Sequence, residues 1–395
     1  MNAILQHVHM PTERVTWPVL LITCLLIAAV LKTALGGRPD PRLPTVTIER
    51  KGFLEKLLPA HILWIKDANS MILKGLKEFS NTCFQVPTAS GYKVIVPNRF
   101  ADELKAHPGL NFNEAFAKDF FVDYPGFEGL RQGLEDDTFM QEVVRVKLTQ
   151  SLGLVTDDLV EEASDSVRDM FGDIREWRTI LLKDHILDVV ARLSSRVFLG
   201  KDLCRNTEWL RITKDYTVDT FMSANLLHLC PGLVRPLVYW FIPTCTRLRK
   251  EVRDARRLIM PEVEKRRMRA EEALQEGKKG PKVADAIGWM VDVSKGRPVD
   301  YVAAQLSLSM AAIHTTSETT TNCMLQLCEN PEAVQLLRKE VIEVLSENGW
   351  SKISLYKMKL MDSFLKEVQR TRGLTSSKHF VLAFGYLTLT AFKLA

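Results

Sequence analysis

The sequence lacks the features that mark several common classes of protein. Its seven cysteines are scattered, without the paired short spacings that a zinc site or a disulfide framework requires, so reduced and largely buried thiols in a cytosol-facing body are expected. No long linker rich in Pro, Gly and Ser divides the chain after residue 45, and no repeat of fixed period occurs. These absences favour one large domain.

A strong excess of one charge is also missing. A formal net charge of +5 over 395 residues is too small to indicate nucleic-acid binding. In the most basic stretch, residues 247–269, acidic residues alternate with basic ones beside an apolar stripe, which is typical of a long helix with one solvated face. The 46% apolar and 26% charged content is that of a globular protein with a large core.

The N-terminus contains a long apolar run without charged residues. Residues 15–31 carry no charge, which is long enough to span a bilayer, and a cleaved signal peptide is the alternative. More basic residues follow the run than precede it, which predicts a cytoplasmic body. We therefore expect residues 1–45 to form a membrane anchor with a stiff hinge at Pro39, Pro41 and Pro44, and residues 46–395 to form the main domain.

The main domain has the pattern of a mainly α protein with one small sheet. Residues 84–86 and 92–96 flank a turn and predict an early hairpin. Later segments carry apolar residues at helical spacing and are separated by Gly and Pro. Helices are predicted near residues 138–151, 157–171, 181–199, 207–228, 244–276, 283–294, 299–329, 332–347 and 360–370.

The most informative segment is a polar run inside an apolar helix. Residues 306–328 are apolar at both ends, but residues 314–322 are nine consecutive polar residues, five of them Thr. Thr is a poor helix former whose hydroxyl can bond to the carbonyl of residue i−3 or i−4. A hydroxyl-lined functional site in a dry core and a surface helix with a Thr-rich side both explain this pattern.

The segment Ala311-Ala312-Ile313-His314-Thr315-Thr316 resembles the central-helix motif of the cytochrome P450 superfamily, in the variant of fungal secondary-metabolism members. The resemblance implies that Thr315 lies beside the oxygen-binding face of haem and helps to deliver protons to bound dioxygen. Ala311 and Ala312 would lie along the haem. His314 replaces the acidic residue of the motif, and it could relay protons because its ordinary pKa is about 6.5.

Two further matches support the resemblance. Glu367 and Arg370 match the Glu-x-x-Arg motif, whose expected role is structural, because they follow the Thr-rich segment by about the family distance. Arg145 lies where the family has a Trp-x-x-x-Arg helix, and the resemblance implies that it binds a haem propionate, with Lys147 in reserve. The Trp of that motif is Gln141 here, and a solvated surface charge is the alternative for Arg145.

One element of the family is absent from the sequence. The iron-ligating cysteine is expected within Phe-x-x-Gly-x-x-x-Cys-x-Gly, and no such segment occurs. Cys328 precedes Glu367, and the Cys-x-Gly at Cys230 lies in the middle of the chain, so neither is in the right order. We therefore expect a P450-like domain that is incomplete at its C-terminus and lacks the thiolate ligand.

The resemblance implies a membrane-bound fungal monooxygenase. It would insert one oxygen atom into an apolar small molecule, of terpenoid type, using haem and electrons from an NADPH-dependent cytochrome P450 reductase. A single-pass location in the endoplasmic reticulum membrane with a cytoplasmic catalytic domain follows. The alternatives are a catalytically inactive truncated fragment and a membrane-tethered helical interaction protein.

Overall fold

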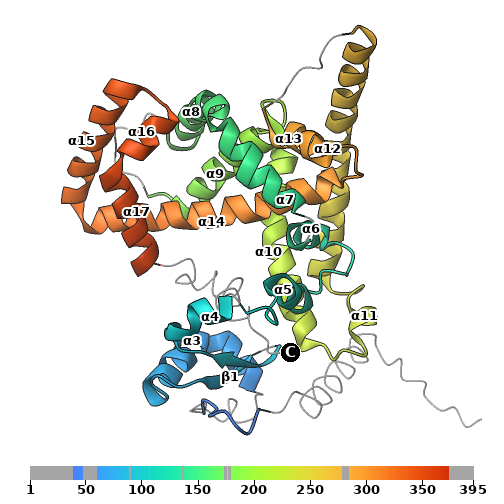
Figure 1. Cartoon of the computed structure of the whole chain (residues 1–395), viewed down its shortest axis with the longest axis vertical. Helices are drawn as coiled ribbons and strands as arrows, with labels where there is room; N and C mark the ends of the chain where they lie inside the picture. Colours follow the sequence, from blue (N-terminus) through green and yellow to red (C-terminus); the bar gives the residue numbers. More distant parts are fainter. Residues whose placement is uncertain are drawn as a thin grey trace, which may run out of the picture.

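A computed structural model describes residues 39–47 and 60–372, apart from short gaps at 89, 106, 136–137, 173–175, 177–178 and 278–283. The described chain is mainly helical and has one two-stranded sheet, as the sequence predicts (Figure 1). Among these residues, no helix is long and apolar enough to cross a bilayer. The predicted anchor at residues 15–31 lies outside the described residues.

The sheet belongs to a small N-terminal unit with its own hydrophobic cluster. Helix α3 (Ala60–Glu78) packs on a hairpin of β1 (Phe84–Thr88) and β2 (Gly91–Ile95), drawn at the bottom of Figure 1. The antiparallel register pairs Phe84 with Ile95 and Thr88 with Gly91, whose φ of +115° suits only glycine at this turn. The predicted hairpin is therefore confirmed.

Gln85 fastens the proline-rich segment before this unit. Its side chain is buried, accepts from the backbone N–H of Asp40 at 3.0 Å, and donates to the carbonyls of Asp40 and Leu43 at 2.7 and 2.9 Å. The backbone of Gln85 also bonds to Pro44 and Val46. Residues 39–47 are thus held against β1, with one isolated parallel bridge between Thr45 and Gln85.

Helices form the rest of the described chain. Short elements come first: η1 (Asn98–Phe100), α4 (Ala101–Lys105), α5 (Phe112–Phe120), α6 (Glu128–Leu134) and α7 (Phe139–Glu142). The longer helices of the body follow: α8 (Thr149–Phe171), α9 (Leu182–Leu199), α10 (Thr207–Leu229), α12 (Pro243–Gln275) and α14 (Tyr301–Glu329). Between and after them lie α11 (Arg235–Val238), α13 (Ala286–Ser294), α15 (Pro331–Asn348), α16 (Lys352–Lys357) and α17 (Lys359–Thr371).

The structure differs from the predicted helices in two ways. The break expected between residues 151 and 157 does not occur, because α7 continues through a π-helical segment, η2 (Val143–Leu148), directly into α8. Gly153 lies exposed inside α8, where a helix tolerates glycine at a cost of about 1 kcal/mol. Helix α3 and the short helices α4, α5, α6, α11 and α16 were not predicted. Elements of four to nine residues are too short to show a clear period, and α3 is interrupted by a non-helical residue, Asp67.

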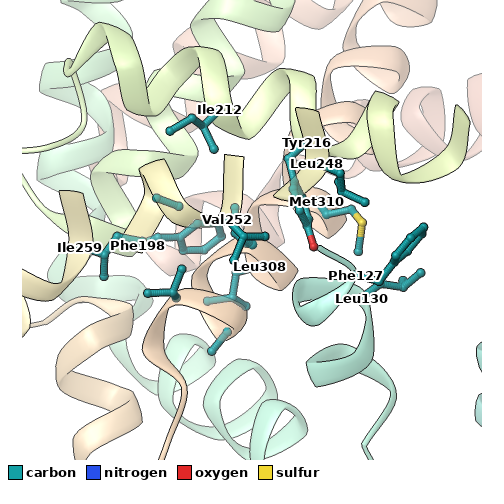
Figure 2. Close-up of a cluster of buried hydrophobic side chains, with 14 of the residues drawn as sticks. Phe127, Leu130, Phe198, Ile212, Tyr216, Leu248, Val252, Ile259, Leu308 and Met310 are labelled. Atoms are coloured by element: carbon teal, nitrogen blue, oxygen red, sulfur yellow. The ribbon is translucent and has the colours of Figure 1, made fainter. Parts of the chain in front are cut away.

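The main core surrounds α14, which crosses the middle of the body in Figure 1. Helices α6, α9, α10 and α12 pack against it. Figure 2 shows Leu308 and Met310 of α14 among side chains of these neighbours, with Tyr216 of α10 extending toward Phe127 and the first turn of α6. Such interdigitation is what a helix that is apolar on most sides requires.

An ion network joins α8 to α9. The Glu162 carboxylate is buried and accepts hydrogen bonds from Arg192 at 2.7 Å and from Arg205 at 2.8 Å. Arg192 is buried as well and also bonds to Asp169 at 2.7 Å. Because each charge has a partner within hydrogen-bond distance, the burial of Glu162 and Arg192 is tolerated.

Candidate active site

Helix α14 has one uncovered face in the region of the polar run. Ala311 and Thr316 are exposed, and Ala312, Thr315 and Thr319 are partly exposed, so these five residues form a stripe that we call the open face. The opposite side, with Ile313 and Ser317, is buried against neighbouring helices. The structure thus places three predicted site residues, Ala311, Ala312 and Thr315, together on the open face.

The hydroxyl groups of the run bond back to their own helix. The Thr315 hydroxyl donates to the Ala311 carbonyl at 2.5 Å, and the Thr319 hydroxyl donates to the Thr315 carbonyl at 2.9 Å. Ser317, Thr320 and Thr321 repeat the i−4 pattern. This back-bonding explains how a Thr-rich segment remains helical from Tyr301 to Glu329, since these five hydroxyls find acceptors in the helix backbone.

His314 contacts α10 and not the open face. Its Nε2 donates to the backbone carbonyl of Lys214 at 3.0 Å, because a carbonyl can only accept. Burial is the largest influence on the ring and lowers the pKa of His314 below its ordinary value of 6.5. The imidazole is therefore neutral near pH 7, with its proton on Nε2 and an acceptor at Nδ1.

Glu318 supports the packed side of α14, and the sequence reasoning did not identify it. It lies one turn after His314 on α14, is buried, and accepts a hydrogen bond from Lys183 of α9 at 2.6 Å. The sequence could have indicated this residue, because Glu318 is four positions after His314 and residues four apart lie on the same side of a helix. The ion pair fixes the packed side of α14 and leaves the open face free.

Arg145 lies in the π-helical segment η2, which packs against α8 and α13. It is exposed, and no hydrogen bond or ion pair joins it to another residue in the part of the chain that the structure describes. Lys147, the reserve candidate, is instead paired with Asp292 of α13 at 2.8 Å. A π-helical turn often marks a functional site, and here it leaves one guanidinium free to bind an anion.

The predicted Glu-x-x-Arg pair is formed on α17. Two hydrogen bonds of 2.7 Å connect the Arg370 guanidinium to the Glu367 carboxylate. The bond to Arg370 lowers the pKa of Glu367, although both side chains are largely exposed. Helix α17 packs against α14, and Asn322 of α14 donates to the carbonyl of Arg372.

The described cysteines lie mainly in the core. Burial raises the pKa of the thiols of Cys204, Cys245 and Cys323, which disfavours the thiolate form that binds iron. Cys230, at the end of α10, is also buried. Cys328 is exposed but lies thirteen residues after Thr315, which places it on another side of α14. These environments are typical of structural thiols.

Comparison with known proteins identifies the family of the chain. The family model for cytochrome P450 matches residues 139–380, which include η2, α14 and α17. The chain is 47% identical to cytochrome P450 monooxygenase bsc2 of Alternaria brassicicola over 90% of this chain and 67% of that protein. It is 43% identical to bsc11 of the same organism, over 88% and 66% of the two chains.

A third relative extends the comparison to another genus. Cytochrome P450 monooxygenase adrA of Penicillium rubens is 36% identical over 91% of this chain and 70% of its own length. The chain therefore spans about two thirds of the length of these relatives. The family consists of haem-dependent monooxygenases, the enzyme class that the resemblance implied. The match over more than half of the chain, together with these identities, shows that this protein belongs to the cytochrome P450 family.

Proposed function

We propose that the protein is a haem-dependent monooxygenase of an apolar, terpenoid-type secondary metabolite, and that α14 forms one wall of its haem pocket. The observation that carries the proposal is the open face of α14, where Ala311, Ala312 and Thr315 are uncovered although the other sides of the helix are packed. Small side chains allow a flat ring to approach the helix backbone closely. Thr315 adds a hydroxyl at the centre of this surface.

Haem supplies the activation of dioxygen in this family, and a cysteine thiolate as axial ligand favours cleavage of the oxygen–oxygen bond. Thr315 keeps its hydroxyl proton on the Ala311 carbonyl, so the oxygen lone pairs remain available to accept a second hydrogen bond on the open face. His314 holds a proton on Nε2 against the Lys214 carbonyl and offers Nδ1 as an acceptor. The Thr315 hydroxyl therefore faces the proposed haem surface, whereas the His314 ring holds its proton on the side of α14 that contacts α10.

Arg145 is the proposed anchor for a haem propionate. Its guanidinium is exposed, carries a permanent charge and has no partner among the described residues, so binding a carboxylate would break no existing ion pair. Replacement by Ala removes one charge-assisted hydrogen-bonding group, which is worth roughly 1.5 kcal/mol or about tenfold in affinity. Arg338 of α15 is also exposed and without a described partner, which makes it a matched control.

Haem titration of the purified chain tests the pocket. We expect Arg145→Ala to raise the Kd for hemin about tenfold, as followed by the Soret band, whereas Arg338→Ala leaves it unchanged. Equal effects of the two substitutions would show that Arg145 acts only through general surface charge. Thr315→Ala is expected to leave the hemin Kd unchanged and to lower product formed per NADPH consumed, with Thr320→Ala of the same helix as its control.

Electrons are proposed to come from an NADPH-dependent cytochrome P450 reductase. Insertion of one oxygen atom of dioxygen into a C–H bond, with reduction of the other to water, consumes two electrons and two protons. NADPH supplies the electrons through the reductase. The apolar substrate class rests on the family resemblance, and substrate-dependent NADPH consumption by the protein with added reductase is the measurement that checks it.

The protein is further proposed to be a single-pass protein of the endoplasmic reticulum membrane with its body in the cytoplasm. The uncharged run at residues 15–31 supports this location. A second support is the segment around α11, where Leu233 is 91% exposed, Leu237 69% and Phe241 78%. Trp240 and its stacked Arg249 lie beside them, a combination that suits the boundary between water and lipid.

Protease protection in microsomes tests the location. We expect added protease to digest the body and to spare a fragment that contains residues 15–31. A fully protected body would place it in the lumen, and release of the intact protein by alkaline carbonate would show that it is not integral to the membrane.

An inactive haem-free relative is the second candidate, and the cysteine environments favour it. None of the seven cysteines lies in the family's Phe-x-x-Gly-x-x-x-Cys-x-Gly pattern, and burial raises the pKa of three of them. A carbon monoxide difference spectrum of the reduced protein separates the two candidates. A red-shifted Soret band, which thiolate ligation produces, would refute the inactive form, and its absence would refute catalysis by this chain.

A further inference from the structure

Glu251 of α12 is a buried carboxyl group with an unsatisfied oxygen. Only 3% of the residue is exposed, and its Oε2 has no hydrogen-bond partner among the described residues. An ionised carboxylate in this position would be strongly destabilising, because burial removes water without supplying a donor. Nothing in the proposed oxidation chemistry uses this residue.

The carboxyl group lies at a charged cleft between α10 and α12. The cleft has a volume of about 420 Å³, and α10 supplies Arg211, Asp215, Val218 and Asp219, while α12 supplies Arg247, Lys250 and Glu251. The surroundings of Glu251 are therefore polar, yet dominated by side chains that are already paired. Because these side chains already have partners, they determine whether Glu251 has a cation partner when it ionises.

Each cation of the cleft is held by another carboxylate. Arg247 forms two hydrogen bonds with Asp219, of 2.7 and 2.6 Å, and Arg211 pairs with Asp215 at 3.0 Å. The third cation, Lys250, pairs with Asp254 at 2.8 Å. Four carboxyl groups thus share three cations, and Glu251 is the one that has none.

Within the described parts of the chain, the other elements near Glu251 supply no counter-charge. On the buried side, the Tyr216 hydroxyl lies within electrostatic range of both Glu251 and Glu128 of α6. In α14, which also packs on α12, His314 and Glu318 are bonded to Lys214 and Lys183. Burial therefore raises the pKa of Glu251, assisted by the charges of Asp219 and Asp215, to about 8.

We propose that Glu251 is a proton-operated latch between α10 and α12. When protonated, it is neutral and lets the two helices close on each other. When ionised, it adds an unpaired negative charge beside Asp215 and Asp219, and the contact between the helices loosens. The loosening spreads along α10, which carries the Lys214 carbonyl that holds His314. The device rests on the packing of α10 and α12, so it does not depend on bound haem.

Hydrogen exchange as a function of pH tests the latch on the full chain. After correction for intrinsic base catalysis, exchange of the α10 and α12 amides is expected to increase at least about tenfold between pH 6.5 and 9.5. Glu251→Gln removes the titrating group and keeps the shape, so this variant should show a flat profile. Glu264→Gln, on the exposed side of the same helix, is the control and should follow the wild type.

A second variant distinguishes titration of Glu251 from loss of a structural residue. Asp219→Asn releases Arg247, which can then pair with ionised Glu251, so the exchange transition should become smaller and move to lower pH. A flat wild-type profile would overturn the proposal, and so would a Glu251→Gln profile that matches the wild type. A transition that Asp219→Asn leaves in place would also overturn it.

Discussion

Removal of the Tyr216 hydroxyl is expected to weaken the attachment of α6 to the body. Tyr216 is almost completely buried, and its hydroxyl donates to the Gly126 carbonyl at 2.9 Å and accepts from the Gly129 N–H at 3.0 Å. Gly129 lies in the first turn of α6 and Gly126 lies just before this helix, about ninety residues earlier in the chain. One side chain of α10 thus satisfies a donor and an acceptor that would otherwise be buried without partners.

The magnitude follows from these two contacts. Tyr216→Phe keeps the ring, so little packing is lost, but both backbone groups lose their partner. A lost hydrogen bond costs about 1 kcal/mol net, and an unsatisfied buried group costs about 1–3 kcal/mol. We therefore expect a loss of about 2–4 kcal/mol in the free energy of unfolding. At about 2 °C per kcal/mol for a chain of this size, Tm should fall by about 4–8 °C.

The loss in free energy of unfolding caused by Tyr216→Phe should not depend on pH in the neutral range. Burial raises the pKa of Tyr216 far above its ordinary value of 10, so the hydroxyl keeps its proton and donates to Gly126 at any pH at which the protein is folded. The difference between variant and wild type should therefore be the same at pH 6 and pH 8. This behaviour separates the hydroxyl from the nearby Glu251, which titrates.

Thermal and urea unfolding, followed by circular dichroism, measure the effect. Tyr356→Phe is the matched control, because Tyr356 is exposed and makes no hydrogen bond in the described structure. Its variant should unfold within about 0.5 kcal/mol of the wild type. The reasoning is refuted if Tyr216→Phe is equally neutral, or if the control loses as much stability.

Three further changes test other parts of the fold. Burial opposes ionisation of Glu162, but hydrogen bonds from two arginines outweigh this effect and lower the pKa of the carboxyl group. The ionised Glu162 therefore stabilises the folded protein fully above the pKa of the unfolded state, and this stabilisation is lost as the pH falls through the lower, folded-state pKa. Glu162→Gln should lower the free energy of unfolding in urea by about 3–5 kcal/mol at pH 7. If the stability of this variant fell with decreasing pH as steeply as that of the wild type, the explanation would be contradicted. Gln85→Ala should expose residues 39–47 to limited proteolysis without altering the melting of the body. Gly129→Ala places a Cβ 2.9 Å from the Tyr216 hydroxyl, so it should destabilise by about 1–3 kcal/mol, and a neutral melt would exclude the close packing of α6.

Much of the fold could be predicted from periodicity. The long helices repeat apolar residues over many turns, so a sequence pattern locates α9, α10, α12 and α14 to within a few residues. The prediction of one helix at residues 244–276 is confirmed although the segment contains Pro261, because α12 continues through this proline from Pro243 to Gln275. Short helices could not be predicted, since α5 and α6 are defined by tertiary contacts such as the bond from Gly129 to Tyr216.

The candidate site was predictable only in part, because sequence adjacency does not fix direction. Thr315 and His314 are neighbours in the motif, yet successive residues of a helix point about 100° apart. Thr315 consequently lies on the open face, while His314 bonds to the Lys214 carbonyl of α10. The role of His314 as a proton relay stays a prediction. Its bond to α10 makes the position of the His314 ring depend on the position of α10, which the motif could not reveal.

The dependence of His314 on the position of α10 connects the packed side of α14 with the cleft at Glu251. The same helix α10 supplies the Lys214 carbonyl to His314, the Tyr216 hydroxyl to α6, and the Asp219 charge to the cleft that contains Glu251. A shift of α10 relative to α12 must therefore change the partner of His314 before it reaches the Thr315 hydroxyl, which is bonded within α14 alone. It follows that Glu251→Gln and a change at His314 should be non-additive in any measurement made above pH 8, whereas Glu251→Gln and Thr315→Ala should add.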